Sequence, residues 1–429
     1  MQAVLLAAGE SSRFFPFNNK HKCLVKIAGE PLVVHTVRAV KRAGITDIIF
    51  ITGDHNDFKD VLGNGKKLGV KIRYVVQKEP TGAGDAVLLA SGLISSDFFL
   101  INSNHVEFDE LKKAIDEKRG TNKNAVLLAR KSSGKHFGVL KVEEDRVLSI
   151  VEKPKSNRGL SNLRVIGVYF LNQEFIDILK NLKREHYSLE KALDIYARDG
   201  KVRFATIDTE ILTLKYPWDL LAVKDYILKK IKRSISKKAS ISKSAQIQGD
   251  VVIEDGAQIA ENSVIKGPAY IGKNSFIGSN TLIRNSSDIE ENCTVGAYME
   301  IRGSLILPDT KTHSGFIGDS VIGQNSRVGA LFGSANVRLD RKNINVEVKG
   351  ARINSSLRSL GVMMGSNVII GERVSTMPGV IIGNNVNIGP STTVMKNIPE
   401  NNIFYTKFKE IIQKNRPASP KITSRGGAA

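Results

Sequence analysis

The chain has 429 residues, a length that predicts two or three domains. Its 41% of hydrophobic residues and 25% of charged residues are ordinary for a globular protein, and no apolar run reaches the roughly 20 residues that a membrane span needs. The formal net charge of +20 leaves three explanations open: a solvated basic surface, small anionic ligands, or nucleic acid. No RNA-binding or DNA-binding module is recognisable, so we expect no nucleic-acid partner.

The cysteines and the amino terminus bear on the compartment. Cys23 and Cys293 lie far apart in the chain, which indicates a reducing environment and no disulfide framework. Met1 leads directly into a strand-like VLLAAG, without the basic and apolar regions of a signal peptide. We therefore expect a cytoplasmic protein that has no contact with a membrane.

The first 230 residues alternate strand-like and helix-like segments. Residues 29–44 have the spacing of an amphipathic helix, and Gly44 closes it. Apolar runs predict strands at residues 3–9, 47–53, 71–77, 98–102 and 125–130. Strands separated by helices are typical of a mostly parallel sheet with helices on its faces.

After about residue 239 the period changes to six. Branched aliphatic residues follow this step at Ile241, Ile247, Ile253, Ile259, Ile265, Ile271, Ile277, Ile283, Ile289, Val295, Ile301 and Leu307. The step returns at Ile322, Val328, Met364, Ile370, Thr376, Ile382, Ile388 and Val394. No helix has this period, and a hexapeptide repeat is the mark of a parallel β-helix.

The repeat has one interruption and a distinct end. Residues 331–361 break the rhythm and predict a loop or hairpin that leaves the coil, which is where solenoids often place a binding surface. Residues 401–429 are basic and then rich in Ser, Gly and Ala, so we expect a short helix and a partly disordered tail. The predicted domains are 1–232, 239–400 and this tail.

Two features of the first domain point to a phosphate site. The first strand runs into a small-residue turn at Gly9, followed by Arg13 and Lys22. Backbone N–H groups of such a turn can approach phosphates, which the two cations would neutralise, although turns of this composition are common. The strand at 98–102 ends in Asn102-Ser103-Asn104-His105, at the edge of a sheet where ligands gather.

The opening LLAAGESSR, with a later lysine and the segment IAGEPL, resembles the signature of the sugar-1-phosphate nucleotidylyltransferases. QKEPTGAGDAV at 77–87, FGVLKVEEDRVLSIVEKP at 137–154 and YPWDLLAVKDYIL at 216–228 resemble further segments of that family in the same order. The resemblance implies a Rossmann-like α/β domain that joins a nucleoside triphosphate to a sugar 1-phosphate. It assigns nucleotide binding to Gly9, Arg13, Lys22, Gln77 and Gly82, and sugar binding to Gly138, Glu152 and Lys153.

The departures from that family fall on its metal ligands. Asn104 and Thr213 stand where the family has residues that bind Mg²⁺, and Glu107 or Asp97 could substitute for them. Mg²⁺ is usually held by one or two carboxylates together with substrate phosphates. Loss of both metal-binding carboxylates would lower the rate of nucleotidyl transfer on the order of 10³-fold or more. A retained but weakened domain and an active transferase with displaced ligands both remain open.

The hexapeptide region resembles the acetyltransferase half of bifunctional glucosamine-1-phosphate acetyltransferase/uridyltransferases, most closely the archaeal type, through THSGFIGDSVIG at 312–323 and ANVRLDRKN at 335–343. The resemblance implies a left-handed β-helix, acetyl coenzyme A as cosubstrate, and a homotrimer. His313 would be the general base and Asn336 would help to hold the acetyl group. The sugar phosphate would contact Arg284, Arg302 and Phe316.

This second half also departs from its family. Phe316 replaces a tyrosine, Arg327 replaces an asparagine, and a small-residue run has become Gly329-Ala330-Leu331-Phe332. The favoured interpretation is a two-domain enzyme of sugar-nucleotide synthesis with a weakened first half. The alternative is a non-catalytic regulatory or scaffold homologue that binds nucleotide sugars or sugar phosphates.

Overall fold

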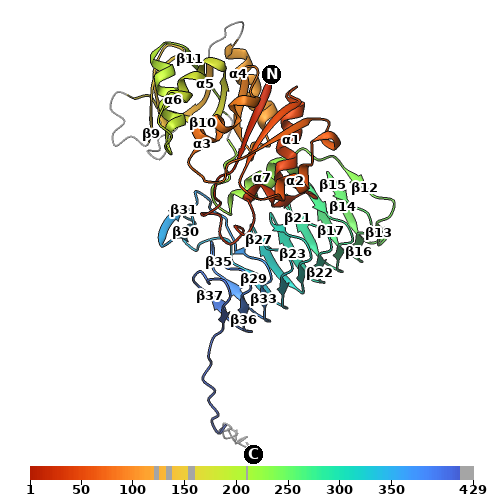
Figure 1. Cartoon of the computed structure of the whole chain (residues 1–429). Coiled ribbons are helices and arrows are strands. Elements are labelled where there is room, and N and C mark those ends of the chain that lie inside the picture. Colours follow the sequence, from red (N-terminus) through yellow and green to blue (C-terminus); the bar gives the residue numbers. More distant parts are fainter. Residues whose placement is uncertain (120–124, 132–137, 153–159, 209–210, 416–429) are drawn as a thin grey trace, which may run out of the picture.

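The computed structural model describes residues 1–119, 125–131, 138–152, 160–208 and 211–415. Figure 1 shows an amino-terminal α/β part that lies on the side of a long, tapering stack of short strands. The chain leaves the end of that stack as an extended segment. Within the described residues, no helix is both long and apolar enough to cross a membrane.

The amino-terminal part is built on one nine-stranded sheet with the order β5-β4-β1-β6-β10-β7-β11-β9-β8. The strands are β1 (Gln2–Ala7), β4 (Asp47–Thr52), β5 (Lys71–Val76), β6 (Phe98–Asn102), β7 (Ala125–Lys131), β8 (Gly138–Glu143), β9 (Arg146–Glu152), β10 (Leu163–Leu171) and β11 (Val202–Thr206). β1 pairs in parallel with β4 and β6, whereas β10 is antiparallel to β6 and β7. The prediction of a mostly parallel sheet is correct only in part. The run β5-β4-β1-β6 and the pair β7-β11 are parallel, but β9 is antiparallel to β11 and to β8, as β10 is to its neighbours, so the sheet is mixed.

Helices cover this sheet because their apolar stripes match its faces. Val33, Val37 and Val40 of α1 follow a helical spacing and are all fully buried, and Gly44 ends the helix with φ +82°. The helices are α1 (Leu32–Arg42), α2 (Asp57–Leu62), α3 (Ala83–Ala90), α4 (Phe108–Arg119), α5 (Gln173–Lys180), α6 (Ser188–Arg198) and α7 (Asp219–Leu228). The helix predicted within residues 29–44 is therefore confirmed.

The second half is a left-handed parallel β-helix whose coils contribute one strand to each of three sheets. The first sheet contains β12 (Ser234–Ile235), β15 (Val251–Ile253), β18 (Ala269–Ile271), β21 (Asp288–Ile289), β24 (Leu305–Ile306), β27 (Val321–Ile322), β32 (Met363–Met364) and β35 (Ile381–Ile382). The second contains β13 (Ser240–Ile241), β16 (Gln258–Ile259), β19 (Phe276–Ile277), β22 (Thr294–Val295), β25 (Lys311–Thr312), β28 (Arg327–Val328), β33 (Ile369–Ile370), β36 (Asn387–Ile388) and β38 (Ile403–Phe404). The third contains β14 (Gln246–Gln248), β17 (Val264–Lys266), β20 (Leu282–Arg284), β23 (Met299–Arg302), β26 (Gly315–Gly318), β29 (Phe332–Ser334), β34 (Ser375–Thr376) and β37 (Thr393–Val394).

The six-residue step produces this shape because it places one aliphatic side chain inside the coil on every face. Ile265, Ile271 and Ile277 occupy three successive faces, and each is fully buried. Many corners between faces are made by asparagines in the left-handed region, such as Asn274 with φ +56°. Gly278 fits because a Cβ there would lie 2.6 Å from the backbone nitrogen of Ala297 on the next coil.

The repeat departs from the predicted register at its twelfth position. Ile306, not Leu307, pairs with Ile289 and Ile322 in the first sheet and points into the coil. The turn after Ile301 is one residue shorter than a hexapeptide, which turns Leu307 outward. Leu307 is buried there against the amino-terminal part.

The predicted excursion from the coil begins later than residue 331. Phe332–Ser334 still forms β29 of the third sheet, and the excursion after it contains an antiparallel hairpin of β30 (Asn345–Val348) and β31 (Ala351–Asn354). Within residues 401–415 the chain forms β38 and then continues without a helix, so the short helix predicted for the tail is absent from this described part. Residues 416–429 lie outside the described part.

The two halves meet through a short hairpin of β2 (Lys26–Ile27) and β3 (Glu30–Pro31). Its turn donates hydrogen bonds from Ala28 N to Asp288 Oδ2 at 2.8 Å and from Gly29 N to Glu290 Oε1 at 3.0 Å. Both carboxyl groups are fully buried, and Asp288 Oδ1 and Glu290 Oε2 have no hydrogen-bond partner among the described residues. Burial raises the pKa of Asp288 and of Glu290, and for Glu290 the neighbouring Asp288 charge adds to this increase.

We predict that Asp288→Asn stabilises the protein at neutral pH by roughly 1 kcal/mol, because it removes a buried charge and keeps an oxygen for Ala28. A carboxyl whose pKa is raised by folding holds its proton more tightly in the folded state. The free energy of unfolding therefore falls as the pH rises from about 4 toward neutrality, and the variant should reduce this slope. Urea denaturation across that pH range measures the effect. The exposed Asp54→Asn is the control, and an equal slope in both variants would contradict the prediction.

Candidate active sites

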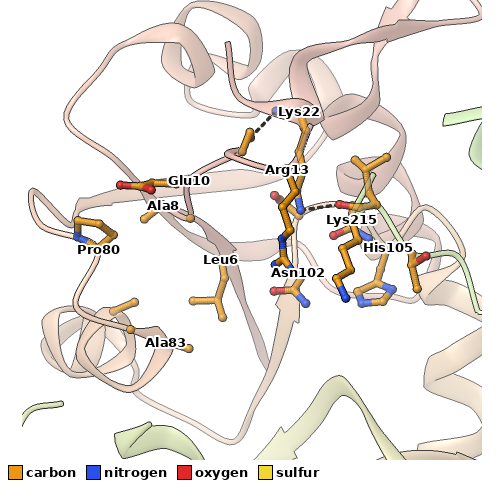
Figure 2. A pocket seen from close by; sticks show the side chains of 18 of the residues that line it. Leu6, Ala8, Glu10, Arg13, Lys22, Pro80, Ala83, Asn102, His105 and Lys215 are labelled. Atoms are coloured by element: carbon orange, nitrogen blue, oxygen red, sulfur yellow. Dashed lines mark hydrogen bonds between the residues drawn. The ribbon is translucent and has the colours of Figure 1, made fainter. Parts of the chain in front are cut away.

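A cavity of about 890 Å³ opens where β1 and β6 end at the same edge of the sheet. Seven predicted residues line it: Gly9, Arg13, Lys22, Gln77, Gly82, Asn104 and Thr213. Figure 2 shows Arg13 and Lys22 reaching into one end of the cavity near Asn102, and Glu10 and Pro80 at the other end. The structure therefore gathers the predicted nucleotide residues and the two expected metal positions around one space.

The predicted sugar residues lie further along the sheet. Gly138 begins β8, is buried, and is the register partner of Glu152 in β9. Gly138 is not among the residues that line the cavity, but β8 pairs with β10 through Val139 and Arg164, and Arg164 does line it. Lys153 lies outside the described residues. The assignment of this group to sugar binding stays a prediction.

The loop after β1 is held by Lys22. Its backbone nitrogen donates to Ser11 Oγ at 3.2 Å, and its ammonium donates to Leu214 O at 2.7 Å. Burial lowers the pKa of Lys22 from its ordinary value, and the Arg13 charge adds to this decrease, whereas Asp219 opposes it. Lys22 thus joins the turn after β1 to the segment that carries Thr213.

The loop between β5 and α3 is closed by the side chain of Gln77. Its Nε2 donates to Gly82 O at 3.0 Å and to Asp85 Oδ2 at 3.2 Å. Gly82 has φ +121°, and a Cβ at this position would lie 2.5 Å from His186 O. This close approach brings α3 and the residues before α6 together at the edge of the cavity.

The end of β6 presents neutral groups to the cavity. Ser103 Oγ donates to Cys23 Sγ at 3.3 Å, and Asn104 is mostly buried. His105 lines the cavity with its Nδ1 3.3 Å from Glu107 Oε1, and its buried Nε2 has no hydrogen-bond partner in the described chain. Glu107 is buried behind this loop, where Oε1 also accepts from Leu212 N at 3.3 Å.

The opposite wall is the segment 211–215, whose backbone is fixed by Asp219. Oδ2 of Asp219 accepts from Lys215 N at 2.6 Å and from Tyr216 N at 2.9 Å, and Thr213 Oγ1 is 3.4 Å away. Burial raises the pKa of Asp219. Asp219 does not line the cavity, whereas Lys215 does.

These residues do not fit a Mg²⁺ ion. Asn104 and Thr213 provide no carboxylate, and the described residues contain no group of three or more His, Cys, Asp or Glu side chains that could hold a metal. The suggested substitutes also fail, since Glu107 does not line the cavity and its Oε1 is engaged by His105 and Leu212 N. Asp97 precedes β6 at its other end, near Arg119. Lys22 and Lys215 would repel a divalent cation at this position.

The second predicted site lies on the outer face of the third sheet of the β-helix. Arg284 and Arg302 are register partners on β20 and β23, and Arg284 Nε donates to Glu300 at 2.8 Å. Arg302 Nη1 is 3.5 Å from Asp319 Oδ2, which also accepts from Asn336 Nδ2 at 2.7 Å. A Cβ on Gly318 would meet both the Phe316 ring and Asn336 Nδ2, so these two side chains lie side by side.

His313 stands at the corner that leads into β26, and its side chain is exposed. Its backbone nitrogen donates to Val328 O at 3.0 Å, which fixes the corner against the next coil. Tyr298 and Leu331 occupy corresponding corners on the neighbouring coils and are 72% and 59% exposed. His313 therefore lies at an exposed corner just before β26, whose other end, at Gly318, is the register partner of Arg302.

The nucleotidyl transferase family model matches residues 2–219, and the model of the GMPPB C-terminal domain matches residues 265–403. The bifunctional protein GlmU of Methanococcus maripaludis is 36% identical over 422 residues, 97% of this chain and 100% of the relative. GlmU of Methanocaldococcus jannaschii is 33% identical over 96% of this chain and all of the relative. A bifunctional sugar-1-phosphate nucleotidylyltransferase/acetyltransferase of Sulfurisphaera tokodaii is 32% identical over 88% of this chain and 93% of the relative.

The chain belongs to the nucleotidyl transferase family. Within it, the chain aligns over nearly its whole length with proteins named as bifunctional, so both halves have counterparts in each of these relatives.

Two residues of the sites were not found from the sequence. Lys215 follows Thr213 by two positions and lines the same cavity. A positive residue so close to an expected metal position was the feature of the sequence that could have identified it. Asp319 joins Arg302 to Asn336 across two coils, a contact that only the register of the β-helix brings about.

We predict that Gly82→Ala lowers the free energy of unfolding by about 2 kcal/mol, because a side chain at this φ is strained and its Cβ meets the backbone of His186. Nucleotide binding should weaken as the loop shifts. Gly9→Ala in the same cavity is the control, since no atom lies within 4 Å of its Cβ. Urea denaturation measures the free energy of unfolding of both variants. An equal decrease in the two would contradict the prediction that the backbone conformation of Gly82 matters.

Proposed function

We propose that the protein is a two-site transferase of sugar-nucleotide synthesis. One half would transfer acetyl from acetyl coenzyme A to an amino-sugar 1-phosphate, and the other would couple a sugar 1-phosphate to a nucleoside triphosphate. The observation that carries the proposal is the grouping of Arg284, Arg302, Phe316 and Asn336 on one sheet face, with the exposed His313 three residues before Phe316 on the same coil. The full-length similarity to bifunctional relatives supports the same assignment.

Acetyl transfer requires a base, and His313 is the residue proposed for it. Its imidazole would take a proton from the attacking amine, whose nitrogen forms a bond to the acetyl carbonyl carbon while the bond to the coenzyme A sulfur breaks. Arg284 and Arg302 would bind the sugar phosphate, because adjacent guanidinium groups present several donors to its oxygens. Asn336 would orient the acetyl group from beside Phe316.

The nucleotide half would use the cavity at the end of β1. Gly9 and its turn would admit the phosphates, Arg13 and Lys22 would neutralise them, and Gln77 with Gly82 would border the base. Gly138, Glu152 and Lys153 are the residues proposed for the sugar. Its rate is proposed to be weakened, since Asn104 and Thr213 supply no carboxylate for a metal.

The assembly and location are part of the same proposal. The exposed corner at His313, Tyr298 and Leu331 would be completed by a neighbouring subunit in a homotrimer formed through the β-helix. An enzyme that uses acetyl coenzyme A and nucleotides, with Cys23 and Cys293 both free and buried, would work in the cytoplasm.

A non-catalytic homologue that binds the same ligands is the second candidate. It is favoured by Phe316, which lacks the hydroxyl of the tyrosine expected from the resemblance, and by the neutral groups at the end of β6.

One assay separates the two candidate functions. Purified protein receives glucosamine 1-phosphate, acetyl coenzyme A and UTP or dTTP, and the release of free coenzyme A and of pyrophosphate is followed together. Release of coenzyme A supports the acetyltransferase, whereas ligand binding without either product supports the regulatory homologue.

We predict that His313→Ala lowers acetyl transfer at least about 100-fold, because it removes the proton acceptor. Binding of coenzyme A and of the sugar phosphate should change little. Lys311→Ala is the control, as Lys311 is exposed two residues away on the same coil. A variant that keeps full activity would exclude His313 as the base.

A further inference from the structure

Resting on the proposed nucleotide half, we propose that its cavity binds the phosphates of a nucleotide without a divalent metal and that Lys215 supplies the positive charge. The segment 213–215 brings a lysine into the cavity two residues after Thr213, the position at which a metal ligand was expected. An ammonium group is a compact point charge that can contact phosphate oxygens directly. A lysine therefore offers a phosphate the charge that a bound metal would otherwise supply.

The backbone that carries Lys215 is held in place. Its nitrogen donates to Asp219 Oδ2 at 2.6 Å, and the next residue, Tyr216, stacks on Trp218 with ring centroids 4.5 Å apart. Trp218 is buried and directly precedes α7. The lysine thus extends from a fixed segment, which reduces the entropy that is lost when it binds a ligand.

The side chain of Lys215 is available to a ligand. Within the described residues it forms no ion pair, and its ammonium lies 5.3 Å from the centroid of the Tyr216 ring. In Figure 2 this side chain runs beside His105 toward Asn102, on the side of the cavity that Arg13 and Lys22 also reach. These three cations converge on the same part of the cavity.

The groups nearby suit an anion better than a cation. The end of β6 contributes amides, a hydroxyl and an imidazole, and the buried Glu107 is engaged by Leu212 N and His105. The cavity-lining carboxylates among the described residues are Glu10 and Glu190. Glu10 lies at the far end, beside Pro80, as Figure 2 shows, and Glu190 comes from α6. A triphosphate would thus gain three cations, whereas the two expected metal positions, Asn104 and Thr213, offer a metal no carboxylate.

The test is calorimetric binding of UTP and dTTP to the full-length protein, in EDTA and in excess Mg²⁺. We expect binding in EDTA, with Mg²⁺ improving the affinity less than threefold. Lys215→Met should weaken metal-free binding at least tenfold, while Lys215→Arg should retain most of it. Lys229→Met is the control, because Lys229 is exposed at the end of α7 and does not line the cavity. Thermal denaturation of each variant checks that it is folded.

A second variant tests the exchange of lysine for metal directly. Asn104→Asp, Thr213→Asp and Lys215→Ala in one chain should make nucleotide binding depend on Mg²⁺. Binding of UTP or dTTP to the natural protein only when Mg²⁺ is present would overturn the inference and leave the proposed nucleotide site intact. Full affinity in Lys215→Met would also overturn it. No binding of either nucleotide in either buffer would reject both the inference and the proposed nucleotide half.

Discussion

The inward stacking of aliphatic side chains along the β-helix is the interaction on which the rest of the structure depends. Ile265, Ile271 and Ile277 lie on three faces of one coil, and the coils above and below repeat the pattern. Each coil buries these side chains against its neighbours, which no single coil could do alone. The outer faces are then free to carry chemistry, and their positions follow from the register of the coils.

Two outer faces of the β-helix have different roles: one contacts the amino-terminal part, and the other carries the residues proposed for acetyl transfer. The first sheet presents Asp288 and Glu290 to the hairpin of the amino-terminal part, while Leu307 packs into the same interface. The third sheet carries Arg284, Arg302 and Asn336. Because the faces are joined coil by coil, the surface that holds the other half and the surface proposed for acetyl transfer share one scaffold.

Much of the fold could be predicted because it rests on local periodicity. The hexapeptide step identified the coil, and the alternation of apolar runs identified the sheet around β1 and β6. Prediction failed at Leu307, where the turn after Ile301 makes the repeat one residue shorter than a hexapeptide. The six-residue spacing of aliphatic residues does not show where such a turn loses a residue. It also missed Lys215, whose place in the cavity depends on the path of the chain after β11 and on Asp219. The resemblance named Lys22, but its bond to Leu214 O joins residues 192 positions apart and follows only from the tertiary fold.

The hairpin that joins the halves begins four residues after Lys22, so one short stretch of chain serves both the cavity and the contact with the β-helix. A single hydrophobic core continues across this contact, from Phe14 and Ile27 to Leu307, Val321 and Met363. Cutting the chain between the halves would leave apolar surface exposed on both fragments and two buried carboxyl groups without their backbone donors. Each half therefore contributes to the stability of the other, and a substitution at this contact would affect the folding of both.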